Sequence, residues 1–172
     1  MTTHATDTAL TLRTPTLTDG ADICELVENT KPLDPNSCYT YLLLSTHFAD
    51  TCVVAQDEDE IVGFVSAYRP PKADDVLFVW QVAVKSTARG RGIATAMLNE
   101  LVERENCKDI AYVEATVTPS NAPSQGLFRS LAKAHNAPCR ETCWFPPESF
   151  GVDDTQDHEA EILFRIGPLQ SR

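Results

Sequence analysis

The segment with the clearest chemical potential is the turn at residues 89–94, of sequence R-G-R-G-I-A. An apolar run at residues 78–84 precedes it, and apolar residues at helical spacing follow it. A glycine-rich turn that opens a helix exposes backbone N–H groups, and the helix dipole favours negative charge there. Two arginines add fixed positive charge to the turn. We therefore expect this turn to bind a phosphate group.

Two familiar phosphate motifs do not fit the turn. A Walker loop is excluded, since G-x-x-x-x-G-K-S/T does not occur and Ile93 follows the second glycine. The dinucleotide fingerprint fits poorly, because Thr95 stands where a third Gly or Ala is expected. The pattern that remains is Q/R-x-x-G-x-G/A, filled by Arg89, Gly92 and Ala94. An ordinary loop with two glycines and two solvated arginines is the alternative.

This pattern resembles the pyrophosphate loop of the GNAT N-acetyltransferase superfamily, whose ligand is acetyl-CoA. The segment V-A-V at residues 82–84 has that family's spacing ahead of Arg89. The family's second signature, N-x-x-A-x-x-L-Y-x-x-L-G-F, is matched from Asn121 onward with both leucines in register. Phe128 replaces the tyrosine that often protonates the leaving thiolate in this family. Because phenylalanine has no proton to donate, the usual general acid is in doubt.

The elements that must position these residues are expected in the order β-α-α-β-β-β-α-β-α-β-β. This order predicts a mixed sheet with helices on its faces. The resemblance implies the α/β (α+β) GNAT fold, with about seven strands and about four helices in one domain over residues 1–172, of which 1–9 form a disordered N-terminus. Strands are expected at residues 10–13, 51–55, 61–68, 77–84, 110–117, 141–145 and 160–166, and helices at residues 18–28, 37–48, 93–101 and 123–134.

Charge and composition narrow the class of partner. The formal net charge of −11 argues against binding to nucleic acid or to an anionic membrane. It suits a cationic substrate, although a solubilising surface would explain it equally. Neither an export signal nor an apolar run of membrane-spanning length is present, so a cytoplasmic protein is expected.

The six cysteines lack C-x-x-C spacing, and in a chain without an export signal we expect them to be reduced. A metal site at Cys139, Cys143 and His158 can be imagined, but that spacing is not diagnostic. No metal is predicted.

Four stretches, at residues 33–44, 78–84, 114–121 and 158–168, together resemble the diaminobutyrate acetyltransferase family of ectoine biosynthesis. The resemblance implies transfer of an acetyl group from acetyl-CoA to the 4-amino group of L-2,4-diaminobutyrate, by a homodimer. Alternatives are an acetyltransferase for another small amine or a protein amine, and a non-catalytic acetyl-CoA sensor.

The chemistry of that reaction requires a general base, and carboxylates are the candidates for this role. An amine attacks a thioester only when neutral, yet an alkylammonium has a pKa of about 10, so a base must accept its proton. Asp34, between two prolines, and Glu159, before the last strand, are the predicted catalytic residues. Trp80 could shield the alkyl chain of the substrate, and packing in the core is the alternative for this residue. The alternative for Asp34 is a place in an ordinary connecting loop, and the alternative for Glu159 is a solvated strand end.

The resemblance implies two groups of site residues. The predicted acceptor site comprises Asp34, Asn36, Ser37, Tyr39, Trp80 and Glu159. The predicted acetyl-CoA site comprises Val82, Ala83, Val84, Arg89, Gly90, Arg91, Gly92, Ile93, Ala94, Thr95, Asn121 and Phe128.

Overall fold

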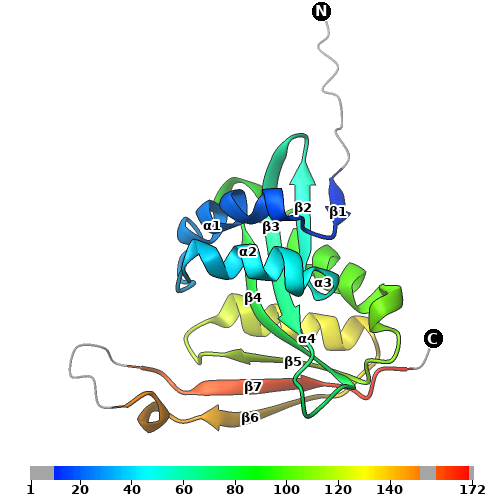
Figure 1. Ribbon diagram of the computed structural model, residues 1–172. Helices are drawn as coiled ribbons and strands as arrows, with labels where there is room; N and C mark the ends of the chain where they lie inside the picture. Colours follow the sequence, from blue (N-terminus) through cyan, green and yellow to red (C-terminus); the bar gives the residue numbers. More distant parts are fainter. Residues whose placement is uncertain (1–9, 152–157, 171–172) are drawn as a thin grey trace, which may run out of the picture. The chain divides into compact units, whose positions relative to one another are not determined.

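The structure is a computed structural model that describes residues 10–151 and 158–170 (Figure 1). Its described part contains seven strands in one sheet, in the order β1-β2-β3-β4-β5-β7-β6, and four α-helices. The predicted order of elements is confirmed. The strands are β1 (Thr11–Arg13), β2 (Val53–Asp57), β3 (Glu60–Tyr68), β4 (Val76–Val84), β5 (Tyr112–Val117), β6 (Cys139–Phe145) and β7 (Glu161–Ile166). The helices are α1 (Gly20–Glu28), α2 (Cys38–His47), α3 (Ile93–Glu103) and α4 (Ala122–Ala134).

The sheet is mixed, as predicted. β2 pairs antiparallel with β1 and β3, and β7 pairs antiparallel with β5 and β6. β4 and β5 pair parallel, with Val76–Phe78 in register with Tyr112–Glu114. Several predicted strand starts are wrong by two residues. For example, Ala49–Thr51 forms a 3₁₀ turn ahead of β2, which moves the start of that strand to Val53.

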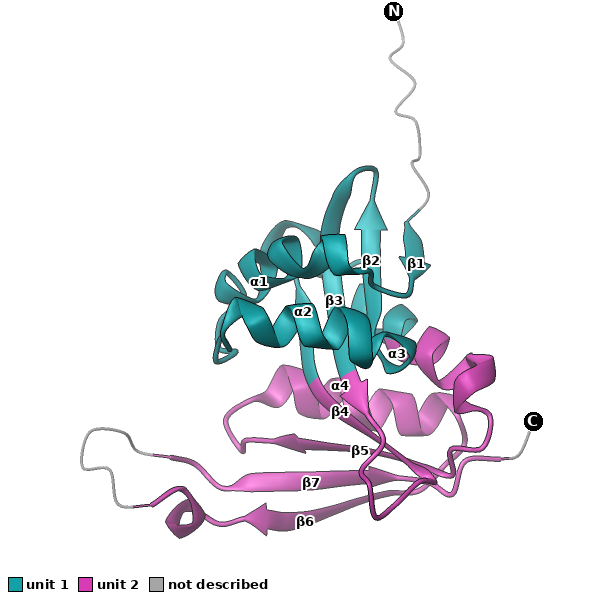
Figure 2. Ribbon diagram, in the orientation of Figure 1, with its two compact units in different colours: residues 1–66, 81–97 teal, residues 67–80, 98–172 magenta. Residues whose placement is uncertain are grey.

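The chain divides into two compact units (Figure 2). Unit 1 comprises residues 1–66 and 81–97, and unit 2 comprises residues 67–80 and 98–172. The prediction of a single domain stays a prediction, and the predicted disordered segment 1–9 lies outside the described residues. No helix in the described ranges combines the length and the apolar character that a membrane crossing needs.

In unit 1, α1 and α2 lie side by side and share a core with the strands. Ile23, Val27 and Tyr41 from the helices are fully buried with Phe64 of β3 and Ala83 of β4. Tyr41 and Phe64 meet edge to face, with ring centroids 6.3 Å apart. This core fixes the two helices on β2 to β4, and with them the connection that carries Asp34.

The start of α3 packs closely on β3 because Gly63 has no side chain. A Cβ atom there would lie 2.9 Å from Met97 Cε and 3.1 Å from Ile93 Cγ2. Both distances are shorter than ordinary carbon contact, so a larger residue would require the side chains of Met97 and Ile93 to shift. Gly63 therefore helps to set the position of the turn at residues 89–94.

In unit 2, α4 packs on β7. Phe128 of α4 and Phe164 of β7 are both buried, with ring centroids 6.3 Å apart. Leu131, which follows Phe128 in α4, is buried as well. The β5–β7 ladder runs from the pair Val113 and Ile166 to the pair Val117 and Ile162. This ladder brings the end of β5 beside the start of β7.

The expectation that every cysteine is reduced is wrong for one pair. Cys24 of α1 and Cys38 of α2 form a disulfide, with Cα atoms 5.3 Å apart. That distance lies in the range of about 4.4–6.8 Å that a disulfide requires. The pairing depends on the two helices lying side by side, which C-x-x-C spacing cannot reveal.

Candidate active site

The turn at residues 89–94 has the geometry expected of a phosphate site. Gly90 and Gly92 have φ values of 78° and 75°, in the left-handed region that glycine adopts readily. A Cβ atom built on either glycine would meet nothing within 4 Å, so the space above the turn is open. The first N–H groups of α3 have no partner within the helix, as at every helix start. The turn can therefore present backbone amides to an anion.

The two arginines of the turn have different surroundings. Arg91 forms an ion pair with Asp57, at 2.6 Å from Nη1 to Oδ2, so its charge is partly offset. Arg89 reaches the carbonyl oxygens of Val84 and Lys31 at 3.4 and 3.5 Å, which is the limit of hydrogen-bond length. Of the two side chains, Arg89 is thus the more readily redirected to a bound phosphate.

The strand that leads into the turn alternates in burial. Ala83 is fully buried, while Val82 and Val84 on either side of it are half-buried. Trp80 has the parity of these two valines and is 45% exposed. The core-packing alternative for Trp80 is therefore wrong, since almost half of the side chain is open to contact with a ligand.

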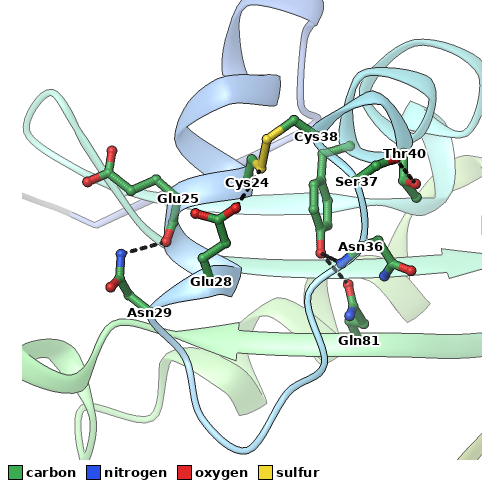
Figure 3. Close-up of a disulfide and its surroundings, with 10 residues drawn as sticks. Cys24, Glu25, Glu28, Asn29, Asn36, Ser37, Cys38, Thr40 and Gln81 are labelled. Atoms are coloured by element: carbon green, nitrogen blue, oxygen red, sulfur yellow. Dashed lines mark hydrogen bonds between the residues drawn. A yellow bond between two sulfur atoms is a disulfide. The ribbon is translucent and has the colours of Figure 1, made fainter.

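Residues 33–37, which we call the acceptor loop, are held by Tyr41 of α2 and by Gln81 of β4, which is distant in the sequence (Figure 3). Gln81 Nε2 donates to the carbonyl oxygen of Asp34 at 3.0 Å. The backbone N–H of Asn36 donates to the hydroxyl of Tyr41 at 3.2 Å, and that hydroxyl donates to Gln81 Oε1 at 3.4 Å. The Asp34 side chain is exposed, so the network orients the loop and leaves the carboxylate accessible.

Sequence reasoning missed both Gln81 and Tyr41. Gln81 is 6% exposed and Tyr41 is fully buried. A signal was present, because Gln81 is the one polar residue in the apolar run at residues 76–84. A buried amide needs hydrogen-bond partners, which here lie in the acceptor loop and in α2.

The other predicted acceptor residues of unit 1 lie at the start of α2. Ser37 is the residue that precedes the helix, and its Oγ lies 3.3 Å from Thr40 Oγ1. Tyr39, in the first turn, is 67% exposed. Both side chains are accessible on the same segment as Asp34 and Asn36.

Glu159, in unit 2, is held by hydrogen bonds from Ser120. Its carboxylate accepts hydrogen bonds from the backbone N–H of Ser120, at 3.0 Å, and from the Ser120 hydroxyl. Glu159 is exposed, yet it is oriented by Ser120 and is more than the solvated strand end that was its alternative. Ser120 was not predicted, although it stands next to Asn121 in the family signature.

Asn121 and Phe128 have structural roles of their own. Asn121 caps α4, since its Oδ1 accepts a hydrogen bond from Ser124 N at 3.2 Å. Phe128 is 3% exposed and lies against Phe164. Its ring therefore fills the core of unit 2, and the predicted contact of both residues with acetyl-CoA stays a prediction.

Each unit carries part of the predicted site. Unit 1 contains the acceptor loop, residues 82–84 and the turn at residues 89–94, and unit 2 contains Trp80, Asn121, Phe128 and Glu159. Among the described residues, one group of potential metal ligands comes together, formed by Cys24, Glu28 and Cys38. Two of its three potential donor atoms, the sulfur atoms of Cys24 and Cys38, are bonded to each other in the disulfide.

Comparison with known proteins agrees with this geometry. The acetyltransferase (GNAT) family matches residues 21–132. The L-2,4-diaminobutyric acid acetyltransferase of Shouchella clausii is 51% identical over 94% of this chain and 89% of its own length. That of Halalkalibacterium halodurans is 50% identical over 95% of this chain and 84% of its own length.

Solved structures give the same result. The diaminobutyrate acetyltransferase EctA of Paenibacillus lautus, solved in complex with its substrate L-2,4-diaminobutyric acid and coenzyme A, has a TM-score of 0.90 and 42% sequence identity. The similarity covers 96% of this chain and 98% of that one. The ribosomal-protein-S18-alanine N-acetyltransferase of Escherichia coli, at 15% identity and a TM-score of 0.69, shares the fold alone. This chain therefore belongs to the acetyltransferase (GNAT) family.

Proposed function

We propose that this protein transfers an acetyl group from acetyl-CoA to the 4-amino group of L-2,4-diaminobutyrate, as in ectoine biosynthesis. One observation carries the proposal: the similarity to proteins of that name extends over almost the whole chain. The P. lautus relative was solved in complex with its substrate L-2,4-diaminobutyric acid and with coenzyme A. The product is N4-acetyl-L-2,4-diaminobutyrate.

The acetyl-CoA site centres on the turn at residues 89–94. Gly90 and Gly92 supply the left-handed backbone and the open space, and the amides at residues 90–95 bind the pyrophosphate. Backbone groups at residues 82–84 hold the pantetheine arm, and an amide there polarises the thioester carbonyl. Acetyl-CoA supplies the activated acetyl group.

The acceptor site is built from carboxylates and an aromatic wall. Asp34 and Glu159 attract the two ammonium groups of the diamino acid, and one of them accepts the proton that the reacting amine loses. The exposed face of Trp80 covers the alkyl chain and offers a cation–π contact. Asn36, Ser37 and Tyr39 bind the polar groups of the amino acid. Glu159 can bind substrate while Ser120 keeps the carboxylate oriented.

The protein works as a homodimer in the cytoplasm. β6 supports the dimer, because it is a terminal strand of the sheet and exposes two neighbouring aromatic rings. Trp144 is 55% exposed and Phe145 is 42% exposed, with ring centroids 6.2 Å apart. An uncovered strand edge with such side chains favours pairing with another chain. Sedimentation of the wild type and of Trp144→Arg tests this, since the variant should shift the protein to monomer.

The decisive experiment for the activity mixes purified protein with acetyl-CoA and a panel of amines: L-2,4-diaminobutyrate, ornithine, lysine and a peptide N-terminus. We expect rapid acetylation of diaminobutyrate alone. Preferred acetylation of another amine would indicate a different acetyltransferase. Binding of acetyl-CoA without turnover of any amine would indicate a sensor, an outcome that Phe128 in place of the family's tyrosine leaves open.

A further inference from the structure

The acceptor loop is closed at its base by a covalent bond. The disulfide joins Cys24, in the middle of α1, to Cys38, the first residue of α2, across a sequence separation of 14 (Figure 3). Asp34 and Asn36 both lie within the ring that this bond closes. A covalent closure of this kind reduces the number of conformations available to the enclosed segment.

A second, non-covalent tie holds the same loop nearer its tip. Gln81 binds the carbonyl oxygen of Asp34, and Tyr41 binds the amide of Asn36. Leu33 adds an apolar contact with the core of unit 1. With the disulfide in place, the short segment that carries the proposed acceptor residues is fixed at both ends. With the disulfide open, the packing of the two helices, the hydrogen bonds and Leu33 remain, and the covalent constraint on the loop is lost.

The bond is placed where a thiol can reach it. Cys24 is 2% exposed, whereas Cys38 is exposed at a surface hollow that is also lined by Ala21, Glu28 and Leu42. A thiolate can therefore attack the sulfur of Cys38, with Cys24 as the leaving group. Glu28 Oε1 lies 3.7 Å from Cys24 Sγ, so once the leaving thiolate has taken a proton from solvent, the Cys24 thiol can donate a hydrogen bond to this carboxylate.

We propose that Cys24 and Cys38 are positioning residues for the amine substrate: their disulfide holds the acceptor loop in its binding conformation, and reduction of the bond weakens binding of the diamino acid. The inference rests on the proposed function. The chemistry is balanced by a dithiol reductant, which gives two electrons and two protons to the pair and is itself oxidised to a disulfide. In a reducing cytoplasm, such a bond forms when the thiol pool becomes oxidised.

The expected effect follows from the fraction of time that the loop spends in its binding conformation. The apparent dissociation constant rises in inverse proportion to that fraction. If the reduced loop is competent for about a tenth to a third of the time, the KM for diaminobutyrate rises about three- to tenfold. The turn at residues 89–94 lies outside the closed ring, and the contact of Arg89 with the Lys31 carbonyl inside the ring is at the limit of hydrogen-bond length, so affinity for acetyl-CoA should change little.

The experiment compares oxidised and dithiothreitol-reduced wild type, with acetylated product measured by mass spectrometry because added thiols disturb a thiol-release assay. Denatured protein is first titrated for thiols. The oxidised form should show about four and the reduced form about six, from the six cysteines and the four outside the disulfide. The oxidised form should have the lower KM for diaminobutyrate, with kcat within about twofold of the reduced form.

Two variants serve as controls. Cys24→Ser/Cys38→Ser should have the KM of the reduced wild type under both conditions. Cys107→Ser removes a buried cysteine outside the pair and should keep the full response of the wild type. If the disulfide only stabilised the fold, opening it would change the melting temperature, or kcat and acetyl-CoA affinity together. The KM for diaminobutyrate would then show no selective change.

Three results would overturn the inference. These are six thiols after oxidation, equal KM values in the two forms, or a KM change that persists in the double variant. Turnover of diaminobutyrate with equal KM values would overturn this inference and leave the proposed function standing. Absence of turnover in both forms would overturn the proposed function, and this inference with it.

Discussion

The turn at residues 89–94 and the acceptor loop at residues 33–37 specify their ligands in different ways. The turn works through its backbone: two glycines with positive φ and the amides of a helix start. The acceptor loop depends on side chains far away in the sequence, since Gln81 is 47 residues from Asp34. A backbone site is encoded locally and can be read from a short motif. A loop held by distant contacts is encoded across the whole unit.

This difference predicts that single substitutions will separate the two ligands. Changes in the turn should affect acetyl-CoA alone, and changes around the acceptor loop should affect the diamino acid alone.

Gly92→Val should abolish measurable binding of acetyl-CoA. Valine is strained at a φ of 75°, and its side chain would fill the open space above the turn. We expect a loss of affinity of about a hundredfold or more, measured by calorimetry, with the circular dichroism spectrum retained. Gly151→Val is the control, because Gly151 has a similar φ of 82° in unit 2 and also faces open space. Unchanged binding by Gly92→Val would remove the turn from the site.

Asp34→Asn and Glu159→Gln should each lower kcat/KM for diaminobutyrate about ten- to a hundredfold. That is the usual effect of losing a charge-assisted contact worth about 1.5–3 kcal/mol. Acetyl-CoA affinity should be unchanged in both. The variant that lacks the base should recover partly at high pH, where more of the amine is already neutral. Wild-type kinetics in both variants would mean that neither carboxylate contacts the substrate.

Gln81→Leu should raise the KM for diaminobutyrate about tenfold. The substitution leaves the carbonyl of Asp34 and the hydroxyl of Tyr41 without their partner, which costs about 1–3 kcal/mol. Tyr41→Phe removes the bond to Gln81 and the bond from the Asn36 amide but keeps the bond between Gln81 and Asp34, and it should raise the KM in the same direction. If Gln81→Leu instead weakens acetyl-CoA binding equally, the network does not act specifically on the acceptor loop.

Asp19→Asn should destabilise unit 1 without changing either ligand's binding. Arg13 lowers the pKa of Asp19 from 3.8 to about 2, chiefly through hydrogen bonds. Because the folded-state pKa is depressed, the stabilisation is complete above about pH 4 and is lost as pH falls through 2. The wild type should exceed the variant by about 2 kcal/mol in unfolding free energy at pH 6, and by almost nothing near pH 2.

Urea denaturation at several pH values measures this difference. A change in the KM for diaminobutyrate in Asp19→Asn at pH 7 would show that the acceptor loop responds to the stability of the whole unit. Effects of Gln81→Leu could then no longer be assigned to the loop alone.

The sequence predicted the features that are encoded locally. The order of elements and the helix start at Ile93 depend on residues a few positions apart, so periodicity and helix-start rules find them. The exposed parity of Trp80 on β4 follows from the alternation of a strand in the same way.

The features that depend on distant residues were not predicted. The disulfide requires α1 and α2 to lie side by side, and the bond between Ser120 and Glu159 spans 39 residues. Tyr41 and Gln81 are likewise 40 residues apart in the sequence, so their contact was not predicted. Such contacts form only when the fold brings the segments together, and no local pattern in the sequence records them.

The central claim is that the acceptor is L-2,4-diaminobutyrate and that its 4-amino group reacts. The most direct test is to let the wild-type protein convert diaminobutyrate with acetyl-CoA and to assign the acetylated nitrogen by NMR. Acetyl-CoA must be consumed one-to-one with product. We predict the N4-acetyl derivative, with kcat/KM for diaminobutyrate at least about a hundredfold above that for ornithine. Acetylation at the 2-amino group, or a preference for another amine, would contradict this account.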